Sequence, residues 1–306
     1  METLSQPELI EREPRATPSW PRITLVTAVR NGARYIEDTI CSVISQGYPN
    51  LEYIVVDSAS TDGTVDIIRK YEKHISRWCS EPDRGMYDGI NKGFAHSKGE
   101  LMGWLNASDL LQTNGLFVVG SVLRSFPKVE WITGRPTGLN SDGSTLQVAP
   151  QLSRWSRYAF LAGANKYIQQ ESTFWRRSLW DRAGGFVDAS YRAEGDFDLW
   201  VRFFRHAQLY SVDAPIGLYR PHKDGLGSSD LDRYNRTCDG IIERELNSTG
   251  WGKPLKAFQR TSLLAKRVPI LQALWYWTAI KGLHRMLSRN EPPIIEGSVG
   301  EWRMRR

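Results

Sequence analysis

The first 80 residues alternate between short β-branched runs and segments with helical spacing, and this alternation most constrains the fold. Residues 22–29 and 51–57 are apolar and rich in β-branched side chains, which predicts two buried strands. Between them, residues 35–46 carry apolar side chains at the helical period. Because parallel neighbours need a crossover connection, the strand–helix–strand order predicts a parallel sheet with helices on its faces.

The same alternation continues to about residue 206. Further strands are predicted at 75–80, 101–105, 129–134 and 170–175, and further helices at 85–97, 113–126, 177–183 and 196–206. Residues 136–166 mix Gly, Ser, Asn and Pro with aromatic residues, which predicts loops around a short strand or hairpin. The predicted fold class is therefore α/β, a mostly parallel open sheet flanked by helices in a Rossmann-like arrangement.

The predicted domain organisation has three parts. Residues 1–20 are polar and contain prolines, as expected of a flexible N-terminal arm. Residues 21–230 form the globular domain, and residues 231–306 form a basic, amphipathic, helical C-terminal extension. Residues 251–306 hold 11 Lys and Arg against 3 Asp and Glu, whereas the first 250 residues hold 29 against 31. Because the excess positive charge is confined to the tail, nucleic-acid binding by the globular domain is not expected.

The cysteines and the tail predict a location. Cys41, Cys79 and Cys238 show neither a metal-site spacing nor a disulfide framework, which predicts a reducing, cytoplasmic compartment. The N-terminus lacks an apolar signal segment, and no apolar run reaches the roughly 18 residues of a membrane span. Residues 254–289 are predicted to form two basic, Trp-containing helices that lie at the inner face of the plasma membrane. Packing on the domain or on a second subunit is the alternative.

Aspartates follow two of the predicted strands. Asp57 ends the strand at 51–57, and Asn106-Ala107-Ser108-Asp109 follows the strand at 101–105. Open α/β sheets bind ligands outside the carboxyl ends of their strands, and an Asp there suits a divalent cation shared with phosphates. The same residue types are also common in turns. Residues 30–34 lack the Gly-x-Gly-x-x-Gly pattern, which argues against a dinucleotide-dependent oxidoreductase.

Four segments between residues 22 and 225 resemble glycosyltransferase family 2, whose members have the GT-A fold. They are the strand from Ile23 to Asn31 with Gly32, IVVDSASTDGT, EPDRGMYDGINKG with GELMGWLNASD, and QQESTFWRRSLWDRAGGF with EGDFDLWVRF. The likeness extends to bacterial enzymes that assemble surface polysaccharides or glycolipids. It implies an inverting hexosyltransferase that uses a nucleotide-sugar donor, with a UDP-sugar favoured, and a glycan or lipid-linked acceptor.

The resemblance implies a nucleotide site at the strand ends. Asp57 would contact the base, and the backbone of Thr27, Ala28 and Val29 would line the same pocket. The remaining residues assigned to the nucleotide are Asp83, Arg84, Asn106 and Ser108. A turn-capping role remains the alternative for Asp57, and helix packing remains the alternative for Asp88 and Asn91.

The resemblance also places a metal ion and the chemistry. Asp109 would bind Mn²⁺ or Mg²⁺, and Ser108 stands where the family usually has a further carboxylate. His222 would reach the metal or the diphosphate; the alternative is a surface-loop histidine. Asp196 would be the base that deprotonates the acceptor, or else a helix N-cap. Gln170, Glu171 and Glu194 would lie at the sugars, and Asp198 would pair with Arg202. The substitution at Ser108 leaves open a catalytically weak scaffold that binds nucleotide or a partner glycosyltransferase.

Overall fold

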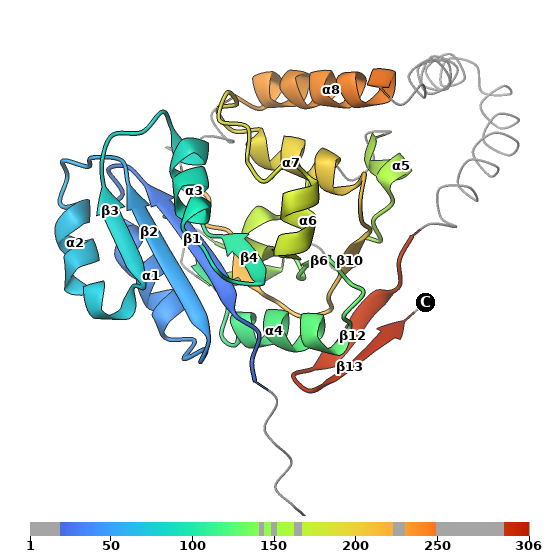
Figure 1. Cartoon of the computed structure of the whole chain (residues 1–306), viewed down its shortest axis with the longest axis horizontal. Coiled ribbons are helices and arrows are strands. Elements are labelled where there is room, and N and C mark those ends of the chain that lie inside the picture. Colours follow the sequence, from blue (N-terminus) through green and yellow to red (C-terminus); the bar gives the residue numbers. More distant parts are fainter. Residues whose placement is uncertain are drawn as a thin grey trace, which may run out of the picture.

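The computed structural model describes residues 19–140, 144–147, 152–161, 167–222, 230–248 and 291–305. Their centre is a seven-stranded sheet with the strand order β10-β6-β9-β4-β1-β2-β3 (Figure 1). Its strands are β1 (Ile23–Val29), β2 (Leu51–Asp57), β3 (Arg77–Ser80), β4 (Leu101–Trp104), β6 (Trp131–Thr133), β9 (Thr173–Arg176) and β10 (Leu209–Ser211). Strand β9 runs antiparallel to β4 and β6, and the other neighbouring pairs are parallel. The predicted mostly parallel α/β sheet is confirmed.

Helices cover both faces of the sheet (Figure 1). They are α1 (Ile36–Ile44), α2 (Thr64–Lys70), α3 (Met86–Ala95), α4 (Gly115–Ser125), α5 (Arg157–Leu161), α6 (Arg177–Arg182), α7 (Gly195–Phe203) and α8 (Leu231–Ser248), with the 3-10 turns η1 (Glu72–His74) and η2 (Gln170–Ser172). Successive side chains of a strand alternate between faces, so β1 contributes Val26 to one apolar core and Leu25 to the other. The first core includes residues of α3, α6, α7 and α8, and the second includes residues of α1, α2 and α4.

Three short pairs of strands lie outside the central sheet. They are β5 (Leu110–Leu111) with β11 (Gly217–Leu218), β7 (Thr137–Leu139) with β8 (Thr145–Gln147), and β12 (Ile294–Ser298) with β13 (Glu301–Arg305). The β7–β8 pair confirms the hairpin predicted within 136–166. The strand predicted at 170–175 begins only at Thr173, because residues 170–172 form η2 and bury their polar side chains instead of pairing.

The predicted helical C-terminal extension holds only in part. Helix α8 is helical as expected, but residues 294–305 form a β-hairpin, which corrects that expectation. The hairpin is fixed by tertiary contacts: Ile295 is fully buried beside β10, and the Trp302 indole N–H donates to Ser121 Oγ of α4 at 2.9 Å. The two basic helices predicted within 254–289 lie outside the described residues.

A buried carboxylate fixes the register of the central strands. Glu52 of β2 accepts hydrogen bonds from Thr24 Oγ1 of β1 at 2.6 Å and from the backbone N–H of Lys98, just before β4, at 2.6 Å. Arg22 and the Gly99 N–H donate to the same carboxylate. Burial alone raises the pKa of Glu52, yet these donors together lower it below its usual value.

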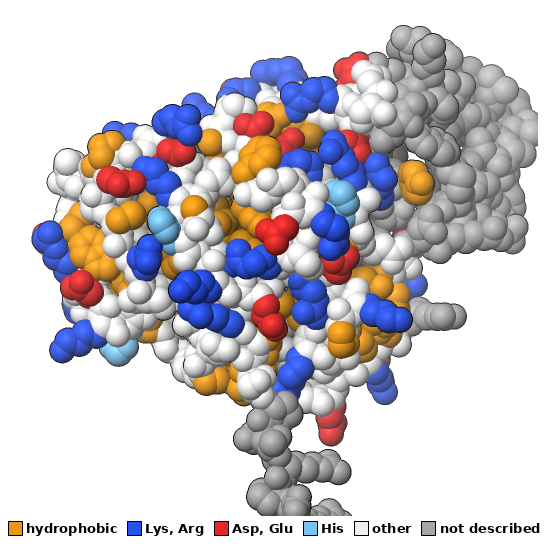
Figure 2. Space-filling view, in the orientation of Figure 1, with side chains coloured by type: hydrophobic (Ala, Val, Ile, Leu, Met, Phe, Trp, Pro, Cys, Tyr) orange, Lys and Arg blue, Asp and Glu red, His pale blue; other side chains and the backbone are white. Residues whose placement is uncertain are grey.

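The visible face of the described residues carries charges of both signs (Figure 2). Figure 2 shows Lys and Arg side chains scattered over the visible face, with Asp and Glu side chains among them. No helix within the described residues is both long and apolar enough to cross a membrane.

Replacing Trp200 should destabilise the fold, because this residue lies in the aromatic core. Its ring stacks on Trp104 with centroids 5.9 Å apart and on Trp131 at 5.6 Å, and it is 1% exposed. Trp200→Ala should therefore lower the free energy of unfolding by about 3–5 kcal/mol, measured by urea denaturation. The control Trp302→Ala removes a partly exposed ring on the hairpin and should cost clearly less. Equal losses in the two variants would contradict this assignment of the core.

Candidate active site

A pocket of about 870 Å³ opens at the carboxyl ends of β1, β2 and β4. Parallel register brings these ends together, since Val29 pairs with Asp57 and Val26 pairs with Trp104. The lining comes from segments far apart in the sequence: the loops after β1 and β4, the start of α3, η2, the start of α7, and α8. Sheets of this type bind ligands at this edge.

The loops after β1 and β2 are joined by hydrogen bonds. The backbone N–H of Asn31 donates to Ser60 Oγ at 2.7 Å, and Asn31 Oδ1 accepts from the Thr61 N–H at 2.9 Å. Asn31 adopts a positive φ of 51°, a conformation that Asn tolerates better than most residues. These bonds tie the pocket-lining Asn31 to the loop after β2.

Asp57 lies fully buried at the end of β2. Its Oδ2 accepts from the Ser60 N–H at 3.0 Å and from Ser80 Oγ at 2.6 Å, while Oδ1 has no hydrogen-bond partner. A buried acceptor without a partner is uncommon and marks a place for a donor from a ligand or water. The pocket lining includes its neighbour Ser58, though not Asp57 itself.

Of the other predicted nucleotide residues, only some reach the pocket. Ala28, Val29 and Asp83 line it, and Asp83 Oδ1 accepts from Ser58 Oγ at 2.8 Å. Thr27 is buried behind the lining, where its Oγ1 accepts from the Tyr53 hydroxyl at 3.2 Å. Arg84 is not in the lining: its side chain is 83% exposed and forms an ion pair with Asp88 at 2.9 Å. Asp88 is thereby assigned to this local pair.

Asn91 has a packing role. Its side-chain amide donates to the Val187 carbonyl at 2.7 Å and accepts from the Val187 N–H at 2.8 Å. This two-point contact joins α3 to the loop before α7. The packing alternative for Asn91 is the one that the contacts support.

The turn after β4 presents Asn106, Ser108 and Asp109 to the pocket. Asp109 is 1% exposed; its Oδ2 accepts from the Asn106 side-chain amide at 3.0 Å, and its Oδ1 accepts from the Arg220 N–H at 2.9 Å. Burial raises the pKa of Asp109 to about 6, although these hydrogen bonds act to lower it.

His222 lies beside this turn, 114 residues along the chain from Ser108. Its Nε2 is 3.1 Å from Ser108 Oγ, and its ring centroid is 5.1 Å from that of Tyr35. His222 is one of the residues that line the pocket. Among the described residues, no group of three or more His, Cys, Asp or Glu side chains forms a metal site.

The turn η2 places two polar side chains on the pocket floor. Gln170 donates from Nε2 to the Trp104 carbonyl at 2.6 Å, and its buried Oε1 has no hydrogen-bond partner. Glu171 is 3% exposed and accepts a hydrogen bond from the Gln169 side chain. Burial raises the pKa of Glu171 well above its usual range, and the negative charges of Asp109 and Asp196 add to this rise.

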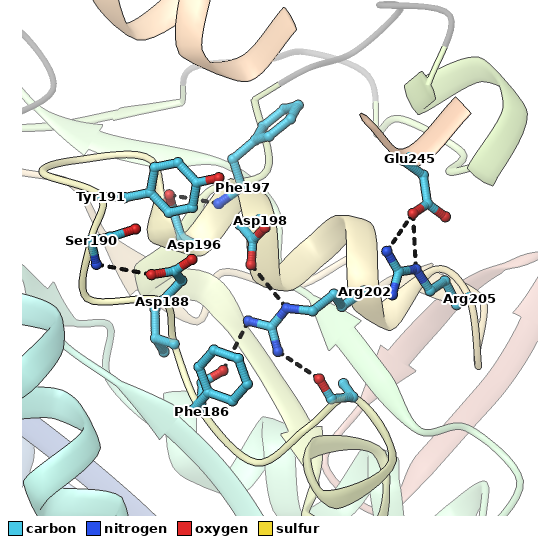
Figure 3. Close-up of polar contacts among 12 residues, drawn as sticks. Phe186, Asp188, Ser190, Tyr191, Asp196, Phe197, Asp198, Arg202, Arg205 and Glu245 are labelled. Atoms are coloured by element: carbon cyan, nitrogen blue, oxygen red, sulfur yellow. Dashed lines mark hydrogen bonds and ion pairs between the residues drawn. The ribbon is translucent and has the colours of Figure 1, made fainter. Parts of the chain in front are cut away.

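Asp196 enters the pocket from the first turn of α7 (Figure 3). The N-cap of α7 is Glu194, and no side chain makes a capping hydrogen bond, so the contacts do not support an N-cap role for Asp196. Its Oδ1 accepts from the Phe197 N–H at 2.7 Å and from the Tyr87 hydroxyl at 3.5 Å. Burial raises the pKa of Asp196 to about 6.

The neighbouring acids have structural contacts. Glu194 is 1% exposed, is absent from the pocket lining, and pairs with Arg233 of α8 at 3.2 Å. The predicted pairing of Asp198 with Arg202 is confirmed at 2.9 Å, and Figure 3 shows Asp198 turned toward Arg202. Arg202 also donates to the carbonyls of Ala183 and Phe186, which anchors α7 to the preceding loop.

The sequence analysis missed the aromatic part of the lining. The side chains concerned are Tyr35, Tyr87, Tyr167, Tyr219 and Tyr234. Tyr35 stands at the start of the segment with helical spacing predicted at 35–46, just after the first strand, and could have been suspected there. The others carry no local signal, because only the tertiary fold brings them to the pocket.

Comparisons with known proteins find sequence similarity to glycosyltransferases. The Glycosyl transferase family 2 model matches residues 24–117. An uncharacterized glycosyltransferase of Mycobacterium tuberculosis is 30% identical over 189 residues, which cover 59% of this chain and 69% of that protein. A poly-β-1,6-N-acetyl-D-glucosamine synthase of Staphylococcus epidermidis is 27% identical over 163 residues, covering 51% and 40%.

Solved structures show the same fold. TarS of S. aureus (residues 1–349) in complex with UDP-GlcNAc superposes with a TM-score of 0.62 at 15% identity, covering 74% of this chain and 66% of that one. The mannosyltransferase PcManGT of Pyrobaculum calidifontis, in complex with GDP-Man and Mn²⁺, superposes with a TM-score of 0.52 at 17% identity, covering 90% and 89%.

The raised pKa of Asp196 gives a stability prediction. The carboxyl titrates at 3.8 in an unfolded chain and at about 6 here, so the folded state binds the proton more tightly and stability falls as pH rises between those values. Asp196→Asn removes this cost and should raise the free energy of unfolding by about 1–3 kcal/mol at pH 7.5, with the gain shrinking toward pH 4. Urea denaturation across pH measures this.

Asp198→Asn is the matched control, because it weakens an ion pair on the same helix. It should lower stability at pH 7.5. A destabilised Asp196→Asn protein at pH 7.5 would show that the Asp196 carboxylate is favourably held, contrary to this account.

Proposed function

Because the chain belongs to glycosyltransferase family 2, we propose that it transfers a sugar, with inversion, from a nucleotide-sugar donor to a hydroxyl of a glycan or lipid-linked acceptor. One observation carries this proposal: a single pocket contains both the strand-end residues Ser58 and Asp83 and the carboxylate Asp196. A donor bound at the strand ends thereby lies in the same space as a base able to act on an acceptor.

The donor nucleotide binds at the ends of β1 and β2 in this proposal. The partnerless Oδ1 of Asp57 would accept a hydrogen bond from an N–H of the base, which a uracil ring offers. Asp83 and Ser58 lie next to it at the pocket wall. UDP-sugars are favoured because the TarS complex contains UDP-GlcNAc, whereas the PcManGT complex contains GDP-Man and keeps guanine as the alternative.

The residues after β4 fit a divalent ion that is shared with the diphosphate. Asp109 offers a carboxylate, His222 an imidazole, and Ser108 and Asn106 neutral oxygens, a set that suits Mn²⁺ or Mg²⁺ when phosphate oxygens and water complete the shell. When bound, the ion would neutralise charge on the leaving diphosphate. With Ser108 in place of a carboxylate, the protein contributes one negative charge here.

Asp196 acts as the general base. Its carboxylate takes the proton from the acceptor hydroxyl, and the acceptor oxygen bonds to the anomeric carbon on the face opposite the diphosphate. The bond from that carbon to the diphosphate oxygen breaks, and its electron pair leaves with the nucleoside diphosphate. A pKa of about 6 lets Asp196 be ionised at neutral pH yet accept a proton better than an ordinary carboxylate.

Gln170 and Glu171 are placed to contact the donor sugar. Both line the pocket between Asp109 and Asp196, and the partnerless Oε1 of Gln170 is an acceptor for a sugar hydroxyl. Glu194 does not share this role, since it is held by Arg233 outside the lining.

The acceptor belongs to polysaccharide or glycolipid assembly in this proposal. Support comes from the likeness to the poly-β-1,6-N-acetyl-D-glucosamine synthase. The predicted basic helices would hold the enzyme at the cytoplasmic face of the membrane, where lipid-linked acceptors are found.

Nucleotide binding is the first test. UDP at millimolar concentration with Mn²⁺ should raise the melting temperature of the full chain, because a ligand bound only to the folded state stabilises it. Asp109→Asn should lose most of the Mn²⁺-dependent part of that shift. The control Asp66→Asn changes an exposed carboxylate on α2 and should shift like wild type. No shift with UDP, GDP, dTDP or CDP would refute the donor site.

Asp196→Asn tests the base. Transfer should fall by about 10²–10⁴-fold, with the UDP shift retained, because only proton removal is lost. Wild-type kcat should rise through a pH of about 6 and then level off. The titratable groups that face Asp196 are Tyr87 of α3, Glu171 of η2, Glu194 before α7 and Tyr234 of α8.

The pH profile separates Asp196 from these neighbours. The residual rate of Asp196→Asn should lack the rise near pH 6 if Asp196 causes it. A variant with wild-type transfer rates would eliminate Asp196 as the base. Nucleotide binding with no turnover by the wild-type protein on any acceptor would favour the scaffold that the Ser108 substitution raised.

A further inference from the structure

Exposed apolar side chains are among those that line the pocket. Six large hydrophobic residues are exposed within the described part of the chain, and three of them line this pocket. They are Tyr167 at 64% exposure, Leu231 at 57% and Tyr219 at 39%. Leaving apolar surface in water is unfavourable, so such a gathering at a pocket marks a surface that a ligand covers.

Tyr167 is held in place although it is exposed. Its ring lies nearly parallel to that of Tyr234, with an interplanar angle of 18° and centroids 6.2 Å apart. Its hydroxyl donates to Asn235 Oδ1 of α8 at 3.0 Å. The hydrogen bond and the ring contact fix the orientation of the ring, which lowers the entropy cost of binding on its exposed surface.

This aromatic pair lies at the Asp196 end of the pocket. Tyr234 is partly buried, and burial together with the charge of Asp196 raises the pKa of the Tyr234 hydroxyl. The pair comes from α8 and from the segment before η2, whereas Ser58 and Asp83 come from the ends of β2 and β3. Tyr234 therefore neighbours both Asp196 and Tyr167.

Resting on the proposed function, we propose that Tyr167, backed by Tyr234 and flanked by Leu231, is the platform that binds a pyranose ring of a glycan acceptor. A pyranose has a face made of C–H groups, which packs on an aromatic ring, and a hydroxyl edge, which Asp196 can deprotonate. These three side chains carry no formal charge at neutral pH. The platform thus recognises a sugar ring rather than a bare lipid phosphate.

The test measures acceptor binding separately from donor binding. Full-length protein saturated with UDP and Mn²⁺ is applied to an array of neutral oligosaccharides, and the Kd is measured for those retained. Tyr167→Ala should bind them about 10-fold more weakly or worse, with an unchanged thermal shift by UDP. Tyr167→Phe keeps the ring and should stay within a few-fold of wild type. Leu231→Ala should weaken binding in the same direction.

Phe186→Ala is the matched control, since Phe186 is an aromatic residue of 46% exposure outside this pocket. It should bind the oligosaccharides like wild type. In transfer assays with a retained oligosaccharide, Tyr167→Ala should raise the acceptor KM, while the KM for the donor and the rate of donor hydrolysis by water stay unchanged.

Three results would overturn the platform. In the first, the wild-type protein retains no oligosaccharide. In the second, Tyr167→Ala binds oligosaccharides as tightly as wild type. In the third, the wild-type protein binds phosphatidylglycerol vesicles and no oligosaccharide. Failure of the proposed function has a different signature, because a wild-type protein that is not stabilised by any nucleotide fails before acceptors are tested.

Discussion

The buried carboxylate of Glu52 holds the three central strands in register, and the site depends on that register. It accepts hydrogen bonds from the starts of β1 and β4, so both strands begin level with β2. With the strands aligned from their starts, Val29 pairs with Asp57 at the ends of β1 and β2, and the shorter β4 ends at Trp104 beside Val26. A slip of one residue would move every side chain of a strand to the other face. The carboxyl-end residues that line the pocket are thus positioned by contacts at the opposite ends of the strands.

The aromatic core sets the position of Asp196 relative to the strand ends. Trp104 is the last residue of β4. Its ring stacks nearly parallel to that of Trp200 of α7, at an interplanar angle of 6°. The turn with Asp109 follows Trp104 directly, and Asp196 stands one helical turn before Trp200. Gly195 allows the close approach of α7 to α3, because a Cβ there would lie 2.7 Å from the Tyr87 ring. Packing of large rings thereby controls the spacing of two carboxylates.

Three buried carboxyl groups lie close together in the pocket, which is electrostatically unfavourable when they are ionised. Asp109, Glu171 and Asp196 lie in or beside it, and burial raises the pKa of each. Such an arrangement costs folding free energy, which the two apolar cores offset, and it is typical of sites that move protons or bind charged ligands. Asp198 and Glu194, each two positions from Asp196 along the chain, instead form ion pairs with Arg202 and Arg233. Acids that are close in the sequence therefore differ in their surroundings: Asp196 lines the pocket, whereas Asp198 and Glu194 form ion pairs.

Periodicity and turn chemistry were enough to predict the alternation of strands and helices, the positions of Asp57 and Asp109 after strands, and the helix that carries Asp196, because these are local properties of the chain. The antiparallel direction of β9, the hairpin at residues 294–305, and the exclusion of Arg84 and Glu194 from the pocket lining depend on contacts between distant segments. The tertiary structure alone brought His222 to Ser108 and Tyr167 to Tyr234. Contacts between segments separated by tens of residues leave no periodic trace in either segment, since they arise from the packing of completed elements.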